Sequence, residues 1–302
     1  MSRDALFDAP ATSSSRPASM PEHTPGLYLR HAWPVRVMHW LNVLAFSVLL
    51  MSGLMIFNAH PALDWGKSSY TGRPSILEIT TREDASGRAV GVTRIFGHEF
   101  VTNGVLGLST GPDGEPASVA FPSWATIPGH YSLAEGRLWH FFFAWVLVLN
   151  GLAYVTYGLV SRHLQRDLAP TPRDWRGIGR SIRDHLAFRH PVGEAAKHYN
   201  VLQKLAYLLV IFGLFPLVVL AGWAMSPWLN SLFSGWVDVF GGRQSARTLH
   251  FVAAWLLVAF VLVHVFEVLI SGAWNQLRSM VTGRYRIPQA SDAATAKENP
   301  HE

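Results

Sequence analysis

Two histidines stand in a stretch of sequence that is otherwise apolar. Between Leu249 and Phe266, His250 and His264 are the only strongly polar side chains. An imidazole in such surroundings costs free energy unless a partner compensates for it. Their separation is about 3.9 turns of α-helix, so both rings lie near one helix face and about 21 Å apart along the axis. One metal ion cannot contact both rings, whereas two separate sites at different depths can.

Three more histidines lie in or at the edge of apolar stretches: His39, His140 and His198. A single histidine in a membrane helix often only forms a hydrogen bond between helices, and this remains the alternative for each of them. The set as a whole needs a joint explanation, which depends on the segments that carry it.

These histidines lie within or next to four apolar runs. They cover residues 37–57, 138–159, 205–226 and 249–270, and only Glu267 places a formal charge inside any of them. Each run gives about 32 Å of helix, which is enough to cross the hydrocarbon layer. Charged residues are 15% of the chain, against about 25% in a soluble domain. The sequence therefore predicts an all-α fold, an integral membrane four-helix bundle.

The basic residues predict how this bundle is oriented. The connection 161–197 carries eight Lys and Arg, whereas 227–248 carries two. Because positive residues stay on the cytoplasmic side, we expect the first of these inside and, with four spans, both termini in the cytoplasm. The net charge of +5 accompanies no nucleic-acid-binding motif, so no nucleic-acid partner is expected.

The remaining segments differ in character. Residues 1–28 and 288–302 are polar and predict disordered tails around one domain at 29–287. The connection 58–137 is expected outside. Its β-like patches flank a Ser-Gly turn signal, which favours a small extramembrane cap, and an insertion without a binding role is the alternative.

The inner connection contains an amphipathic pattern. Trp175, Ile178, Ile182 and Leu186 follow helical spacing, and arginines occupy the other faces. This is typical of a helix that lies on an anionic membrane surface, with a solvated helix as the alternative.

Depth in the membrane pairs four of the histidines. His140 and His250 each lie at the start of a run that begins on the outer side. His39 is at the start of a run that begins inside, and His264 is near the inner end of the fourth run. We therefore expect one pair near each face, His140 with His250 outside and His39 with His264 inside.

Two facing imidazoles in an apolar bundle suit haem b, whose iron takes a neutral nitrogen on both axial sides. Zinc would need more ligands at each site, and no Asp accompanies these histidines. The chain contains no cysteine, which excludes thiolate-bound clusters and covalent c-type haem. Arg36, Arg137 and Arg247 each precede one of the histidines by three residues. They are candidate partners for haem propionates, with snorkelling to the interface as the alternative.

Four motifs carry a resemblance to a known family. They are "VRVMHWLN" at 35–42, "GRLWHFFFAW" at 136–145, "KHYNVLQKLAY" at 197–207 and "ARTLHF…VLVHV" at 246–265. Together they resemble the bacterial cytochrome b561 and nickel-hydrogenase cytochrome b family, whose fold also serves formate dehydrogenase and thiosulfate reductase. The resemblance implies two b haems, on the same histidine pairs, and a location in the bacterial inner membrane.

The same resemblance implies a quinone site near the inner haem, at the entrance of the third span. In this sequence the implied quinone site corresponds to Asn200, Gln203 and Lys204, and more loosely to His198 and Tyr199. Capping and snorkelling at a helix end are the alternative roles. His198 is also the alternative inner ligand in place of His39.

The function that follows is electron transfer between membrane quinone and a periplasmic partner, a molybdopterin oxidoreductase or a hydrogenase-type subunit. The chain is then a subunit of an oxidoreductase complex, surrounded by membrane lipid. Two alternatives are a stand-alone quinol-oxidising cytochrome b and a metal or proton transporter that uses the histidines as a relay.

Overall fold

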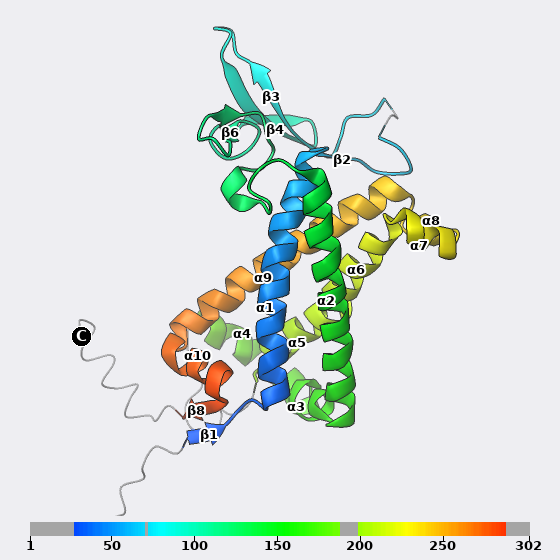
Figure 1. The fold of residues 1–302 in the computed structure, drawn as a ribbon. Helices are drawn as coiled ribbons and strands as arrows, with labels where there is room; N and C mark the ends of the chain where they lie inside the picture. The colour runs from blue at the N-terminus through cyan, green and yellow to red at the C-terminus, as the bar shows by residue number, and fades with distance from the viewer. Residues whose placement is uncertain (1–26, 70–71, 188–198, 288–302) are drawn as a thin grey trace, which may run out of the picture.

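The computed structural model describes residues 27–69, 72–187 and 199–287. Four helices are long and apolar enough to cross a membrane: α1 (Trp33–Asn58), α2 (Leu133–Val160), the composite Val201–Ala224 and α9 (Arg243–Ile270). Helices α1 and α2 stand side by side, and α9 crosses obliquely behind them (Figure 1). The four predicted spans are therefore confirmed, and the helices extend beyond most of the predicted bounds.

The third span is not a uniform α-helix. It consists of α5 (Val201–Leu209), a π-helical stretch η4 (Val210–Leu214) and α6 (Phe215–Ala224). Pro216 is the second residue of the last part. Proline has no N–H for the bond to the residue four positions earlier and its ring crowds that carbonyl, so the helix widens by one residue before it. This changes which face α6 turns toward α9.

One end of the bundle, here the cap end, carries a β structure (Figure 1). Its four-stranded sheet has the order β2-β3-β4-β5, with antiparallel pairing throughout. The strands are β2 (Ala62–Leu63), β3 (Leu77–Glu83), β4 (Ala89–Ile95), β5 (His98–Val101) and the separate pair β6 (Ser109–Thr110) and β7 (Pro116–Ala117). A short 3-10 turn, η1 (Ser123–Ala125), leads toward α2.

The cap corrects the all-α expectation, because the fold is mostly helical with a small β unit. The predicted β patches are confirmed as β3 and β4. Their turn is closed by Asp84, whose carboxylate accepts from the Ser86 and Arg88 backbone N–H groups at 2.8 and 3.0 Å. Short strands of this kind form because alternate side chains can pack on a buried cluster, here built on Phe57, Ile79 and Phe121.

The cap is tied to the helices by hydrogen bonds that are buried or partly buried. Thr248 on α9 donates to the Asp64 carbonyl at 2.7 Å, and Ser245 accepts from the Gly66 N–H at 2.8 Å. Asn58 at the end of α1 exchanges two bonds with the Phe121 backbone, at 2.7 and 3.1 Å. These bonds fix the start of α9 against the cap, and they therefore fix the position of its first turns along the bundle.

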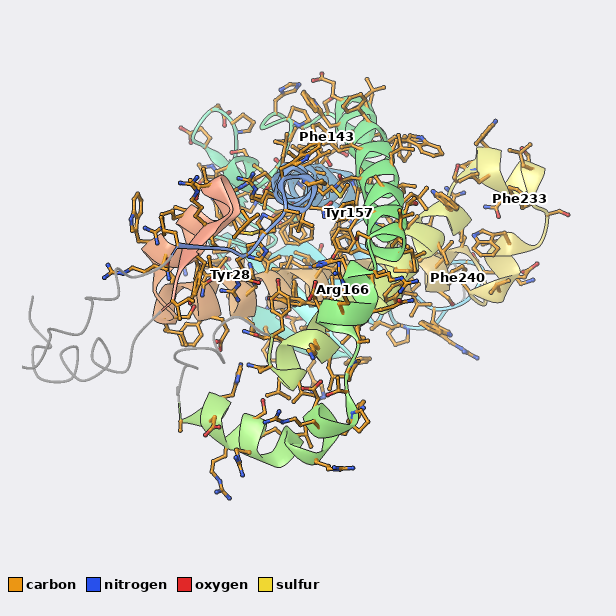
Figure 2. The ribbon with its side chains drawn as sticks, turned by 90° about the horizontal axis from the view of Figure 1, so that it is seen from below. Tyr28, Phe143, Tyr157, Arg166, Phe233 and Phe240 are labelled. Carbon is orange, nitrogen blue, oxygen red and sulfur yellow. The ribbon has the colours of Figure 1, made fainter. Side chains whose placement is uncertain are left out.

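The opposite end of the bundle, here the tail end, holds the short elements of the inner connection and both described chain ends. Strand β1 (Leu27–Leu29) pairs antiparallel with β8 (Arg284–Arg286). Figure 2 looks from this end and shows α1 end-on, with α3 and α4 at the margin of the molecule. The other elements are η2 (Leu164–Leu168), α3 (Pro172–Arg176), α4 (Ile178–Leu186) and α10 (Ala273–Thr282); α7 (Pro227–Leu232) and α8 (Trp236–Val239) lie at the cap end.

Four apolar helices of this length are those of a multi-pass membrane protein. The predicted amphipathic segment forms α3 and α4, which meet at Gly177. Trp175 and Ile182 are exposed there. It remains a prediction that this segment lies on a membrane surface. The cytoplasmic position of both termini and the domain limits at 29–287 also remain predictions. Residues 1–26 and 288–302, which include nearly all of both predicted tails, lie outside the described residues.

Candidate functional site

The structure brings the four histidines together in two pairs. His140 on α2 faces His250 on α9, with ring centroids 6.1 Å apart and planes at 65°. His39 on α1 faces His264 on α9, with centroids 6.4 Å apart and planes at 60°. The first pair lies toward the cap end and the second toward the tail end. Helix α9 contributes to both, as its histidine spacing leads one to expect. His198 lies outside the described residues.

The spacing within each pair fits one metal ion held from two sides. A metal–imidazole bond is about 2 Å long and the ring centre lies about 1.1 Å behind the nitrogen, so opposed ligands put centroids about 6.3 Å apart. The two measured distances lie on either side of this value. Within the described ranges no group of three or more His, Cys, Asp or Glu is placed to hold a metal ion. Two-ligand sites in apolar surroundings are what a porphyrin-bound iron requires.

Ser52 fixes the ring of His140. Its Oγ lies 3.1 Å from His140 Nδ1 and donates its own proton to the Val48 carbonyl at 2.6 Å. With its proton engaged, the hydroxyl accepts from Nδ1–H, and Nε2 keeps its lone pair for a metal. Ser52 is fully buried, so no water competes for this bond.

His250 is held in the same tautomer by the backbone of the third span. Its Nδ1 lies 2.7 Å from the Val218 carbonyl oxygen, which can only accept. Gly222, one turn further along α6, makes room for this approach. A Cβ on Gly222 would stand 3.2 Å from His250 Cε1, and one on Gly53 would stand 3.4 Å from His140 Cε1. A glycine therefore lies against each imidazole of the cap-end pair.

The tail-end pair has different surroundings. The Nδ1 of His39 is buried and has no hydrogen-bond partner among the described residues. The Phe260 ring stacks on His264, with centroids 6.0 Å apart and planes at 14°, and Trp40 meets His39 edge-on at 5.4 Å. Among the described residues, His39 therefore lacks the Nδ1 hydrogen bond that each imidazole of the cap-end pair has, and the aromatic walls fit an apolar macrocycle.

A polar clamp holds α1 against α2 close to His39. Asn150 on α2 donates to the Met38 carbonyl at 2.8 Å and to Asn42 Oδ1 at 2.7 Å. Asn150 is buried. Hydrogen bonds of this kind fix the rotation of two helices that apolar packing alone leaves free.

The three arginines of the sequence analysis already contact protein groups. Arg36 donates to the Val281 carbonyl on α10, while its Nε is buried without a partner among the described residues. Arg137 lies over the Phe141 ring at 5.5 Å. Arg247 donates to the His60 carbonyl and lies over Phe57 at 5.5 Å. Arg247 therefore joins α9 to the cap, and Arg36 joins α1 to α10.

The polar residues at the entrance of the third span are engaged locally. Asn200 and Gln203 form a reciprocal capping box at the start of α5, with N–H···O distances of 2.9 and 3.2 Å. Lys204 is buried and pairs with Asp174 of α3 at 2.9 Å. Tyr199 packs edge-on against Tyr207 at 5.5 Å. Burial raises the pKa of its hydroxyl, so this group remains a proton donor at neutral pH.

Sequence reasoning missed Ser52, Gly222 and Asn150. Asn150 had a usable signal, since it is the only strongly polar side chain in the middle of its run. Ser52 and Gly222 had none, because small residues are common in membrane helices for packing alone.

Comparison with known proteins identifies the family. The sequence profile of the prokaryotic cytochrome b561 family matches residues 30–283. A protein of Azospira oryzae with the provisional name "protein-methionine-sulfoxide reductase subunit YedZ1" is 27% identical over 239 residues, covering 79% of this chain and 89% of the relative. A protein of Cupriavidus necator named "Probable Ni/Fe-hydrogenase B-type cytochrome subunit" is 22% identical over 296 residues, covering 94% and 96%.

A protein of Azotobacter chroococcum with the same hydrogenase-subunit name is 30% identical over 156 residues, covering 47% of this chain and 65% of the relative. No solved structure matches the chain with significance. The family match covers all four apolar helices and both histidine pairs. The chain therefore belongs to the prokaryotic cytochrome b561 family.

Proposed function

We propose that the chain is the membrane subunit of an oxidoreductase complex and conducts electrons between the quinone pool and a partner through two b haems. Membership of this family implies a membrane protein that binds haem b and transfers electrons. The proposal of two haems depends on one observation: two pairs of imidazoles have ring centroids 6.1 and 6.4 Å apart. A haem bound in each would supply a one-electron carrier with both axial positions filled.

The chain's own residues define what such sites can do. His140 with His250 and His39 with His264 are the proposed iron ligands, and their apolar walls exclude water. With two imidazoles committed to each haem, the sites would leave no open position for substrate chemistry and would supply one-electron transfer. The relay alternative is disfavoured because Glu267 is the only carboxylate in the apolar runs, and proton or metal pathways normally use several.

The test is haem extraction and a dithionite-reduced minus oxidised spectrum on the purified chain. We expect b-type absorbance and two haems per chain. A colourless protein, produced with ample porphyrin supply, would contradict the proposal and favour the relay alternative.

The bond between Ser52 and His140 predicts a difference between the two sites. Ser52→Ala removes the acceptor for Nδ1–H, so the imidazole becomes a weaker donor to iron and the oxidised state loses stabilisation. We expect the midpoint potential of the cap-end haem to rise, by at most about 60 mV if the whole free energy of one hydrogen bond acts on one state. A redox titration measures it. The tail-end potential and the haem content should not change, and Ser52→Thr should restore the original value.

The proposed partner is a soluble redox protein on the outer side. Its type remains open between a periplasmic molybdopterin oxidoreductase and a hydrogenase-type subunit. Several relatives carry the hydrogenase name and one carries the sulfoxide reductase name. The cap-end pair lies closest to the β cap, so a partner on this face would exchange electrons there. A stand-alone cytochrome, in contrast, would turn over quinol without any partner.

The proposed quinone site remains at the entrance of the third span, with His198, Tyr199, Asn200, Gln203 and Lys204. Tyr199 supports it, because the ring series Tyr199, Tyr207, Phe260 and His264 connects this entrance to the tail-end pair. The capping box uses the side-chain oxygens of Asn200 and Gln203, so their amide N–H groups are the donors left for a quinone carbonyl.

Asn200→Ser separates the two roles of this residue. Serine keeps the oxygen that caps α5 but has no amide N–H. We expect quinol-driven haem reduction to slow about fivefold, the value of one hydrogen bond of about 1 kcal/mol. Stopped-flow absorbance measures the rate, and dithionite reduction and haem content serve as controls. An unchanged rate would remove Asn200 from the quinone site.

A further inference from the structure

An open cavity lies at the tail end, where α9 ends and α10 turns back toward β8. Its volume is about 630 Å³, and its lining includes Ser271, Trp274, Asn275, Arg278 and Arg286. In Figure 2, α10 lies at the side of the bundle next to β1. None of the described lining residues is acidic, and neither histidine pair contributes to the cavity.

Asn275 organises the two arginines of this cavity. Its Oδ1 accepts from Arg278 at 2.8 Å and from the Arg286 backbone N–H at 2.9 Å, while its Nδ2 donates to the Arg286 carbonyl at 2.7 Å. The three bonds hold β8 against α10. They hold Arg278 and Arg286 on one wall of the cavity at a fixed separation, so this wall is ordered.

The charge on this wall has no acidic counterpart among the residues that the structure describes. Within the described ranges, neither Arg278 nor Arg286 forms an ion pair with a carboxylate. The Nε of Arg278 is buried and has no hydrogen-bond partner there. A buried guanidinium N–H without an acceptor is costly, and a phosphate oxygen is the acceptor that guanidinium geometry matches best.

The outer face of α10 is apolar next to the cavity. Trp274, Leu277 and Val281 follow helical spacing and are 76%, 45% and 58% exposed. Trp274 belongs to both features, because it also lines the cavity. A ligand that places an anionic group against the arginines therefore has an apolar stripe beside it. Free phosphate matches only the first feature, whereas a phospholipid matches both.

We propose that this cavity binds the phosphate headgroup of an anionic phospholipid, whose acyl chains pack along Trp274, Leu277 and Val281. Arg278 and Arg286 contact the phosphate oxygens, and Asn275 positions Arg278. Bound lipid joins the end of α9 to β8, and through β8 to β1. This site is separate from both histidine pairs, so it does not depend on the proposed haem sites.

Native mass spectrometry of the delipidated full-length chain tests the proposal. The probes are phosphatidylglycerol, phosphatidylcholine and inorganic phosphate. We expect phosphatidylglycerol to bind at least tenfold more tightly than phosphatidylcholine. The double variant Arg278→Gln/Arg286→Gln should lose at least tenfold in this affinity, and Arg278→Lys, which keeps the charge but not the planar fork, should lose less.

The matched control is Arg173→Gln/Arg176→Gln on α3, which removes the same charge from the same end and should change the affinity less than twofold. Equal losses in both double variants would show general electrostatic attraction and overturn the proposal. Competition by inorganic phosphate at equal concentration would show an anion site without lipid selectivity and would also overturn it. The far-UV circular dichroism of each variant shows whether it is folded, and a chain without haem would fail the proposed function while leaving this test intact.

Discussion

Replacing His250 with alanine is expected to remove one haem and leave the other. His250 pairs only with His140, whereas His264 on the same helix pairs with His39. With one of its two imidazoles removed, each site would hold haem through a single protein ligand, which weakens the binding. We therefore expect about one haem per chain in His250→Ala and in His264→Ala, with different midpoint potentials for the haem that remains.

The partner histidines make this prediction sharper. His140→Ala should reproduce the spectrum and the remaining potential of His250→Ala, and His39→Ala should reproduce those of His264→Ala. His130→Ala is the matched control, since this histidine contacts Glu135 at the protein surface and should leave both haems in place. The pairing is wrong if His250→Ala and His39→Ala lose the same centre, or if either single variant keeps both haems.

The positions of these histidines along the membrane were predictable from the sequence for a physical reason. Helix rise is constant, so the offset of a histidine from the end of an apolar run gives its depth directly. Two residues at equal depth on different helices need only the correct rotation to meet. A single helix with His250 and His264 near one face fixes that rotation for both pairs at once.

The contacts that support the rings were not predictable in the same way. Ser52 and Gly222 act across helix interfaces, and which residue faces an imidazole depends on the rotation of the neighbouring helix. In the third span that rotation changes at the π-helical stretch η4. Pro216 signals an irregularity there, but the local sequence does not state by how many degrees α6 turns.

The quinone candidates show how one sequence motif is compatible with two roles, helix capping and quinone binding. Asn200 and Gln203 stand three residues apart at a helix start, which is the signature of a capping box, and the structure contains that box. Lys204 forms an ion pair with Asp174, which no pattern within 197–207 reveals. A resemblance to a family identified these residues as a group. Only the fold shows that their oxygens and the ammonium group already have partners.

Gly222→Leu is expected to remove the cap-end haem while the tail-end haem stays. A Cβ at this position would lie 3.2 Å from Cε1 and 3.3 Å from Nδ1 of His250, closer than most contacts in folded proteins. The ring cannot retreat without breaking its 2.7 Å bond to the Val218 carbonyl. Overpacking of this kind costs about 1–3 kcal/mol, and here the cost falls on the ligand itself. Haem extraction measures the loss.

A graded series separates this effect from general damage to the helix. Gly222→Ala should weaken the cap-end haem less than leucine does, and Gly53→Ala should be tolerated, since its Cβ would stand 3.4 Å from His140. Gly151→Leu is the matched control, because nothing lies within 4 Å of a Cβ there. Leucine favours a helix over glycine by about 1 kcal/mol, so helix propensity predicts no loss in either leucine variant. Equal haem loss from Gly151→Leu and Gly222→Leu would show that the contact with His250 is not what matters.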